Sequence, residues 1–192
     1  MNGQIVREIA ASAFTDAIEI MAIIETLEAG NQKPPVTKGL NDAGAGRAAE
    51  HIKRALFTRL HFLVSRAYAK SREGDLHARR AFDLLKDPAV RADVVGKATE
   101  ADMVDAEVQW NKCIGDHRLP AFLHFRDKYL AHLGEPEDGI PLPTYGEVFG
   151  LAKDTAQAME KLAQGAGVVS LSLDSQIPAH KTSAEIFWNK WA

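Results

Sequence analysis

The sequence contains one cysteine, Cys113, among its 192 residues. A lone thiol cannot form an intramolecular disulfide or supply the cysteines of a structural zinc site. This composition fits a reducing compartment, so we expect a cytoplasmic location. No apolar run approaches the ~20 residues of a membrane span, and the N-terminus lacks the basic-then-apolar order of a signal peptide. We therefore expect no membrane partner.

Several common catalytic patterns are also missing. The seven histidines form no His-Glu-x-x-His pair, no Gly-rich loop precedes Lys and Ser or Thr, and no serine lies in a nucleophile-elbow pattern. Glu73, Asp75 and His77 lie close in sequence, but this spacing is more typical of a solvated turn than of metal ligands. We expect neither a metal ion nor another cofactor.

The formal net charge is only -3, which argues against a protein that coats nucleic acid. The charge is unevenly distributed, however, because residues 47–80 contain nine Lys and Arg against three Asp and Glu, a local balance of +6. Such a run usually solvates a helical surface. A surface that faces RNA is the alternative.

Apolar residues recur at helical spacing from Ile5 to about Leu27, which predicts a long first helix. Residues 30–46 are rich in Gly, Pro and Asn and predict a loop that joins two helices. Residues 47–70 are apolar around much of the helical circumference, which predicts a central helix buried on several sides.

The next segments carry helix-start signals. Asp75 is a candidate cap for a short helix that ends near Leu85, and Asp87-Pro88 predicts the start of a helix that continues to about Cys113. Four acidic residues between 100 and 107 give this helix an acidic face, which could pair with the basic segment.

Two further helices follow. One begins at Asp116 or at Leu119-Pro120 and ends near Leu133, and Thr144 with Glu147 forms a predicted capping box for the other. Residues 169–173 then alternate apolar and Ser, which predicts a short extended segment, and residues 186–191 predict a small amphipathic helix. The fold class expected is all-α, an up-and-down helical bundle in one domain.

One pair of residues carries chemical content. Arg126 and His132 are six positions apart in a predicted aromatic-rich helix, at the edges of a stripe formed by Phe122, Phe125, Tyr129 and Leu133. In an α-helix they lie about 9 Å apart along the axis, too far for one hydrogen bond. Two such faces meeting at a two-fold axis would gather two guanidiniums and two imidazoles in a cleft suited to phosphate.

The segment Arg126-Asp127-Lys128-Tyr129-Leu130-Ala131-His132 resembles the Arg-spacer-His motif of the HEPN superfamily, in particular its abortive-infection U-like branch. The resemblance covers residues 1–165. It implies a HEPN-type helical domain over these residues, and leaves residues 166–192 as an extension that packs on the domain or on a dimer partner.

The resemblance further implies a homodimer and, in active members, a metal-independent endoribonuclease of a toxin or abortive-infection system, with an antitoxin protein as a partner. His132 would move a proton of the ribose 2′-hydroxyl or of the leaving oxygen, and Arg126 would hold the phosphate. Tyr129 could stack on a base, and Asp127 and Lys128 are further candidates for substrate binding.

Two functions therefore stay open: an RNase, or a non-catalytic dimeric module that binds a nucleotide, RNA or a partner protein. Asp127 favours the second, since a carboxylate lowers the local positive potential. It could also face away and orient Lys128 or a partner's Arg. His132 in the last turn of a helix would interact favourably with free carbonyls without any catalytic role.

Overall fold

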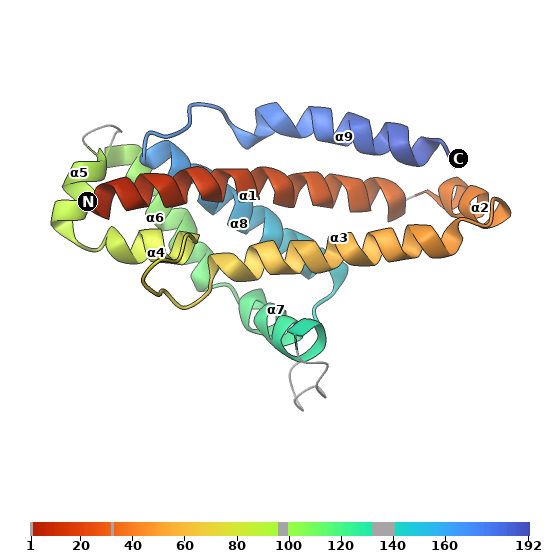
Figure 1. The fold of residues 1–192 in the computed structure, drawn as a ribbon, viewed down its shortest axis with the longest axis horizontal. Helices are drawn as coiled ribbons and strands as arrows, with labels where there is room; N and C mark the ends of the chain where they lie inside the picture. The colour runs from red at the N-terminus through yellow and green to blue at the C-terminus, as the bar shows by residue number, and fades with distance from the viewer. Residues whose placement is uncertain (1, 32, 96–99, 132–140) are drawn as a thin grey trace.

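A long apolar helix, α1 (Asn2–Asn31), forms the axis of the molecule, and the other helices pack around it (Figure 1). The computed structural model describes residues 2–31, 33–95, 100–131 and 141–192. Over these residues the chain is helical and contains no strand, as the sequence predicts. None of the described helices is both long and apolar enough to cross a bilayer.

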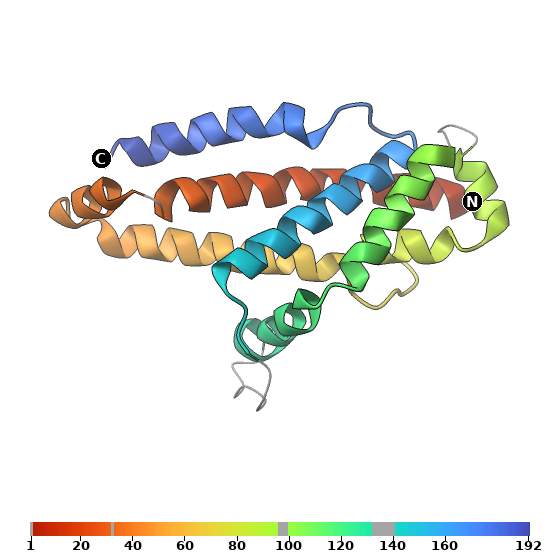
Figure 2. The ribbon, with the colours of Figure 1, turned by 180° about the vertical axis from the view of Figure 1, so that it is seen from behind.

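The remaining elements follow α1 in chain order and include one π-helical segment, η1. They are α2 (Pro34–Asp42), α3 (Gly46–Ala67), α4 (Ala78–Leu84), α5 (Pro88–Val95), α6 (Glu100–Ile114), α7 (Arg118–Phe125), η1 (Arg126–Ala131), α8 (Tyr145–Gly165) and α9 (Leu173–Asn189). In Figure 1, α9 and α3 run on either side of α1. In Figure 2, which shows the molecule from behind, α8 crosses in front of α1 and α6 packs beside α8. α1 contacts α3, α4, α5, α8 and α9.

The central helix is α1, so the prediction that residues 47–70 are central is wrong. α3 buries one face against α1 and leaves large apolar side chains in solvent on another, with Phe62 52% exposed. The guanidiniums of Arg59 and Arg66 lie 5.5 and 5.7 Å from the Phe62 ring centroid. The apolar residues around the circumference of α3 thus include a surface stripe covered by arginine.

The basic stretch finds its acidic partners on α1. Arg59 donates two hydrogen bonds of 2.8 Å to Glu19, and Arg66 forms an ion pair with Asp16. Burial raises the pKa of Asp16, and the hydrogen bond from Arg66 opposes that rise. The acidic face of α6 instead meets α5, where Arg91 pairs with both Glu100 and Glu107.

The segment between α1 and α3 contains a helix, α2, where the sequence predicts a loop. The two prolines that suggested a break, Pro34 and Pro35, occupy the first two helical positions, where an N–H has no partner to lose. Val36 and Leu40 of α2 are buried with Ala49 and Trp188 in a second small core. α2 therefore closes the end of the bundle where the chain also terminates (Figure 1).

The C-terminal helix is longer than predicted. α9 begins at Leu173 and continues through Pro178 to Asn189, after a stretch without regular secondary structure that ends at Ser172, whose backbone is extended. Its Trp188 indole N–H donates to the Thr26 carbonyl at 2.8 Å, and the ring fills the space beside Gly30. Trp188 thus fastens α9 to the end of α1.

The predicted helix caps at Thr144 and Asp87 are confirmed, whereas the one at Asp75 is not. The Thr144 side chain accepts from the Glu147 N–H, and Glu147 accepts from the Thr144 N–H, a complete capping box at the start of α8. The Asp87 carboxylate accepts from the Ala89 N–H at 2.8 Å at the start of α5. Asp75 does not cap α4, which begins at Ala78; its carboxylate accepts instead from the Arg72 N–H.

Candidate functional site

The motif helix, α7 with η1, forms an arm on one side of the bundle (Figure 2). Its start is fixed by Asp116, whose carboxylate accepts from both the backbone and the side chain of Arg118 at 2.8 and 2.9 Å. These bonds lower the pKa of Asp116 to about 2. Arg118 also pairs with Asp154 of α8, so one guanidinium joins the arm to the bundle.

Aromatic side chains attach the arm to α3. Phe122 of α7 is buried and stacks on His61 of α3 with ring centroids 4.3 Å apart. Phe125 lies 4.9 Å from the same imidazole and 6.4 Å from Phe57. The stripe predicted from Phe122 and Phe125 therefore faces α3, and it is covered by the chain itself.

His61 has no solvent exposure, and neither ring nitrogen has a hydrogen-bond partner within the part of the chain that the structure describes. Burial among these rings lowers the pKa of His61 to about 4, because the charged imidazolium is poorly solvated there. The sequence indicated nothing special about this residue, since its environment is created by a helix more than sixty residues away.

The arm changes from α-helix to π-helix at Arg126. A π turn connects residue i to i+5, so the angle of 100° per residue behind the predicted stripe does not apply after Phe125. Phe125 and Leu130, five positions apart, line the same groove beside the arm. π turns are rare and often occur at functional sites.

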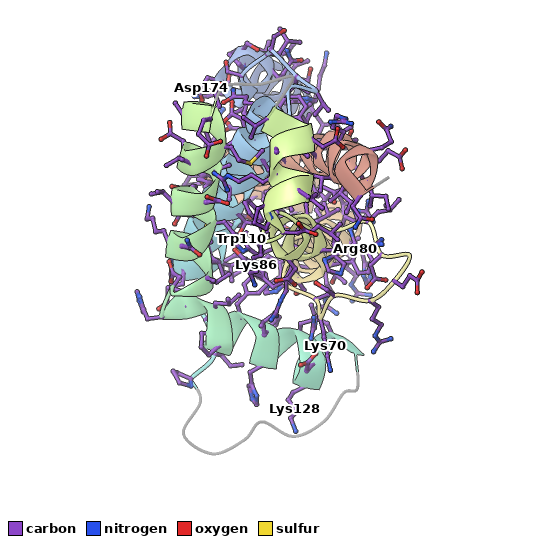
Figure 3. All side chains as sticks on the ribbon, turned by 90° about the vertical axis from the view of Figure 1, so that its left-hand side faces the viewer. Lys70, Arg80, Lys86, Trp110, Lys128 and Asp174 are labelled. Atoms are coloured by element: carbon purple, nitrogen blue, oxygen red, sulfur yellow. The ribbon has the colours of Figure 1, made fainter. Side chains whose placement is uncertain are left out.

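Arg126 is partly exposed, with 33% of its side chain accessible, and it pairs with Asp127 next to it. Its Nε donates to the Asp127 carboxylate at 2.6 Å. The Asp127 carboxylate thus points toward Arg126 and is not turned away from it. Lys128 projects from the end of the arm, and Asp174 lies on the other side of the molecule (Figure 3).

The other predicted site residues belong to the far end of the motif. The backbone of Tyr129 is part of η1, but its side chain lies outside the described residues. His132 and Leu133 also lie outside them. The predicted juxtaposition of Arg126 with His132 therefore stays a prediction.

A groove of about 640 Å³ lies between the arm, α3, the end of α1 and the start of α8. Its walls include three rings and three charged side chains: Glu50, Lys53, Arg54, Phe57, Phe125 and Tyr145. Four of the six come from α3 at positions i, i+3, i+4 and i+7, a helical face that sequence periodicity would assign to the core. Among the described residues, no three His, Cys, Asp or Glu side chains gather as metal ligands would.

A HEPN family model described as AbiU2 matches residues 3–187 of the chain. The matched span contains the whole Arg126–His132 segment and most of α9. Neither a curated protein nor a solved structure matches the chain.

Proposed function

Because this chain belongs to the AbiU2 family of HEPN proteins, we propose that it is a metal-independent endoribonuclease that uses Arg126 and His132 in the cleft of a homodimer. In the cell it would act in the cytoplasm as a toxin or abortive-infection component, restrained by an antitoxin protein.

The proposed reaction needs only these two side chains and the RNA. The neutral imidazole of His132 takes the proton of a ribose 2′-hydroxyl, and the 2′-oxygen attacks the adjacent phosphorus. The bond from phosphorus to the 5′-oxygen breaks, and that oxygen takes the proton from the imidazolium of His132 and leaves as a 5′-hydroxyl. The other product ends in a 2′,3′-cyclic phosphate. Arg126 binds two phosphate oxygens and offsets the charge that develops on them.

The position of Arg126 carries the proposal. The residue stands at the first position of a π turn, one third exposed, on an arm that Arg118 and the His61 stack hold against the bundle. A guanidinium on a fixed support is suited to grip a phosphate from solvent. A structural arginine of the core would be expected to lie inside the packed face of α7 instead.

The test is cleavage of end-labelled tRNA and mRNA in EDTA by the wild-type protein and by the variants Arg126→Ala and His132→Ala. The wild-type protein should cut and leave a cyclic phosphate end, whereas each variant should lose activity by about 100-fold or more, the usual contribution of a general acid–base or an oxyanion contact. Equal cleavage by all three proteins would exclude the proposed chemistry.

One observation favours the second function, a dimeric module that binds RNA, a nucleotide or a partner protein without cleavage. Asp127 holds the Arg126 guanidinium and offsets the charge that a phosphate would need. A wild-type protein that binds RNA but leaves it intact, with Asp127→Asn equally inactive, would assign this function.

A further inference from the structure

We propose that the groove beside the arm binds single-stranded RNA next to the phosphate held by Arg126, with a base on Tyr145 and a backbone phosphate at Arg54. This inference rests on the proposed function for the identity of the ligand. The inference goes beyond the proposed function by assigning a substrate-binding surface on α3 and α8, outside the Arg126–His132 motif.

The rings of the groove differ in exposure: Tyr145 presents its ring to solvent, whereas Phe57 and Phe125 are half-buried. Tyr145 is 61% exposed, and its ring centroid lies 4.8 Å from that of Phe57. Phe57 in turn lies 6.4 Å from Phe125, so the three rings form a connected wall. The capping box of Thr144 and Glu147 fixes the backbone from which Tyr145 projects. Exposed rings on a rigid support are what unstacked bases bind.

The cations of the groove differ in their availability. The Lys53 ammonium donates to the Gly30 carbonyl at 3.1 Å and lies 5.4 Å from the Trp188 ring centroid. It is therefore already engaged in contacts at the end of α1. Arg54, one residue on, is exposed and makes no hydrogen bond or ion pair with the described residues. Its guanidinium is therefore available for a phosphate.

Glu50 lies one helical turn before Arg54 on the same wall, and its carboxylate repels a phosphate. This gives the groove a polarity: a cation toward the arm and an anion toward the start of α3. The groove volume of about 640 Å³ is within the ~300–1,000 Å³ typical of small-ligand sites, enough for a nucleotide.

The groove adjoins the motif directly. Phe125, which forms part of its wall, immediately precedes Arg126 on the arm. A strand whose phosphate is bound by Arg126 would therefore reach the groove with a neighbouring nucleotide. An acidic peptide would use the same cations but would not need the flat ring of Tyr145.

The experiment measures the affinity of a short fluorescein-labelled single-stranded RNA by anisotropy, in EDTA and in the His132→Ala background so that no cleavage occurs. Tyr145→Ala should weaken binding about tenfold, the scale of one lost stacking contact, whereas Tyr145→Phe should bind like the parent. The matched control is Phe62→Ala, which removes an exposed ring from α3 outside the groove.

Charge is tested by the dependence of affinity on salt. Arg54→Ala should weaken binding and reduce the slope of log affinity against log salt by about 0.7, the value for one phosphate contact on a single strand. Arg72→Ala, beyond the other end of α3, should leave the slope unchanged. Glu50→Gln should strengthen binding a few-fold, because it removes the repelling charge.

The outcomes separate the two proposals. If the wild-type protein does not cut RNA but binding depends on Tyr145 and Arg54, the nuclease proposal fails and the groove assignment holds. If Tyr145→Ala and Phe62→Ala bind alike, or if no RNA binds, the groove assignment is overturned. Equal affinity for single-stranded and double-stranded RNA would also overturn it, since paired bases cannot stack on the ring.

Discussion

The Arg126 guanidinium lies against a carboxylate one residue away. Both side chains are substantially exposed, at 33% for Arg126 and 51% for Asp127, so solvent screens the pair and it contributes little to stability. The ion pair instead affects ligand binding, because a phosphate must displace Asp127 or share the guanidinium with it. Asp127 therefore weakens phosphate binding at Arg126.

Asp127→Asn should release Arg126 and strengthen RNA binding about two- to fivefold, the range expected when an exposed ion pair is removed. Anisotropy with the labelled RNA measures this. Asp174→Asn is the control, because it removes the same charge from the side of the molecule opposite Lys128, the residue that follows Asp127 (Figure 3). An equal gain in both variants would mean that only net charge matters.

His61 makes the folded protein sensitive to mild acid. Its pKa is about 4 in the folded state and near 6.5 in the unfolded chain, so below about pH 6.5 the unfolded state binds the extra proton. Stability is therefore complete above that pH and declines as the pH falls toward 4. The arm rests on this ring, so its attachment depends on a neutral imidazole.

The free energy of unfolding should fall by about 2 kcal/mol between pH 7.5 and pH 5 through His61 alone, at 1.36 kcal/mol per pKa unit. Urea denaturation at the two pH values measures it. His61→Phe keeps a ring among its aromatic neighbours and should remove this part of the decline. His51→Gln, which changes an exposed histidine, should keep the decline; an unchanged decline in His61→Phe would contradict the assignment.

Sequence patterns at the residue scale identify contacts that are local. The caps made by Asp87, Asp116 and Thr144 follow from side chains two or three positions from the N–H groups they bind. The groove and the Arg118–Asp154 pair join residues far apart in sequence, so no local spacing announces them. The motif identified both Arg126 and Asp127, but their pairing with each other was not predicted.

Helices with an uninterrupted apolar pattern are predictable at the scale of whole elements. α1, α3 and α8 contain no internal proline and show helical spacing throughout. α2 was missed and α9 was predicted too short because each contains proline, at positions 34, 35 and 178, and because their stability comes from packing against distant helices. Propensity alone underestimates such helices.

The attachment of α9 depends on a glycine. A Cβ at Gly30 would lie 2.6 Å from Cε2 of Trp188, so Gly30→Ala should force the indole from its place and cost about 1–3 kcal/mol of stability. Thermal unfolding measures this. Gly146→Ala is the control: its new methyl meets no atom closer than 4.0 Å, so its melting temperature should stay the same or rise. Equal melting temperatures for the two variants would mean that the close contact between Gly30 and Trp188 contributes nothing measurable to stability.

At the scale of the whole molecule, the arm projects to one side and leaves the opposite side to α9 (Figure 2). Two copies that joined through their arms would keep their remaining helices apart. We expect that in such a homodimer each site would take Arg126 from one protomer and His132 from its partner.

A mixing experiment tests this arrangement. Arg126→Ala and His132→Ala proteins should each be inactive, whereas an equilibrated mixture should recover about a quarter of wild-type cleavage, because half the dimers are mixed and each contains one intact site of two. Light scattering confirms that the dimers have formed. A mixture as inactive as its components would mean that both side chains act within one protomer.

The π turn has a consequence for how this chain tolerates length changes. A π turn is a helical turn with one residue to spare, so a single deletion between Arg126 and Ala131 can be absorbed by reverting to the α-helical path. Everything after the deletion would then keep nearly its present direction, because the α-helical turn completes the same rotation with one residue fewer. The same deletion within α7 would instead turn everything after it by about 100°.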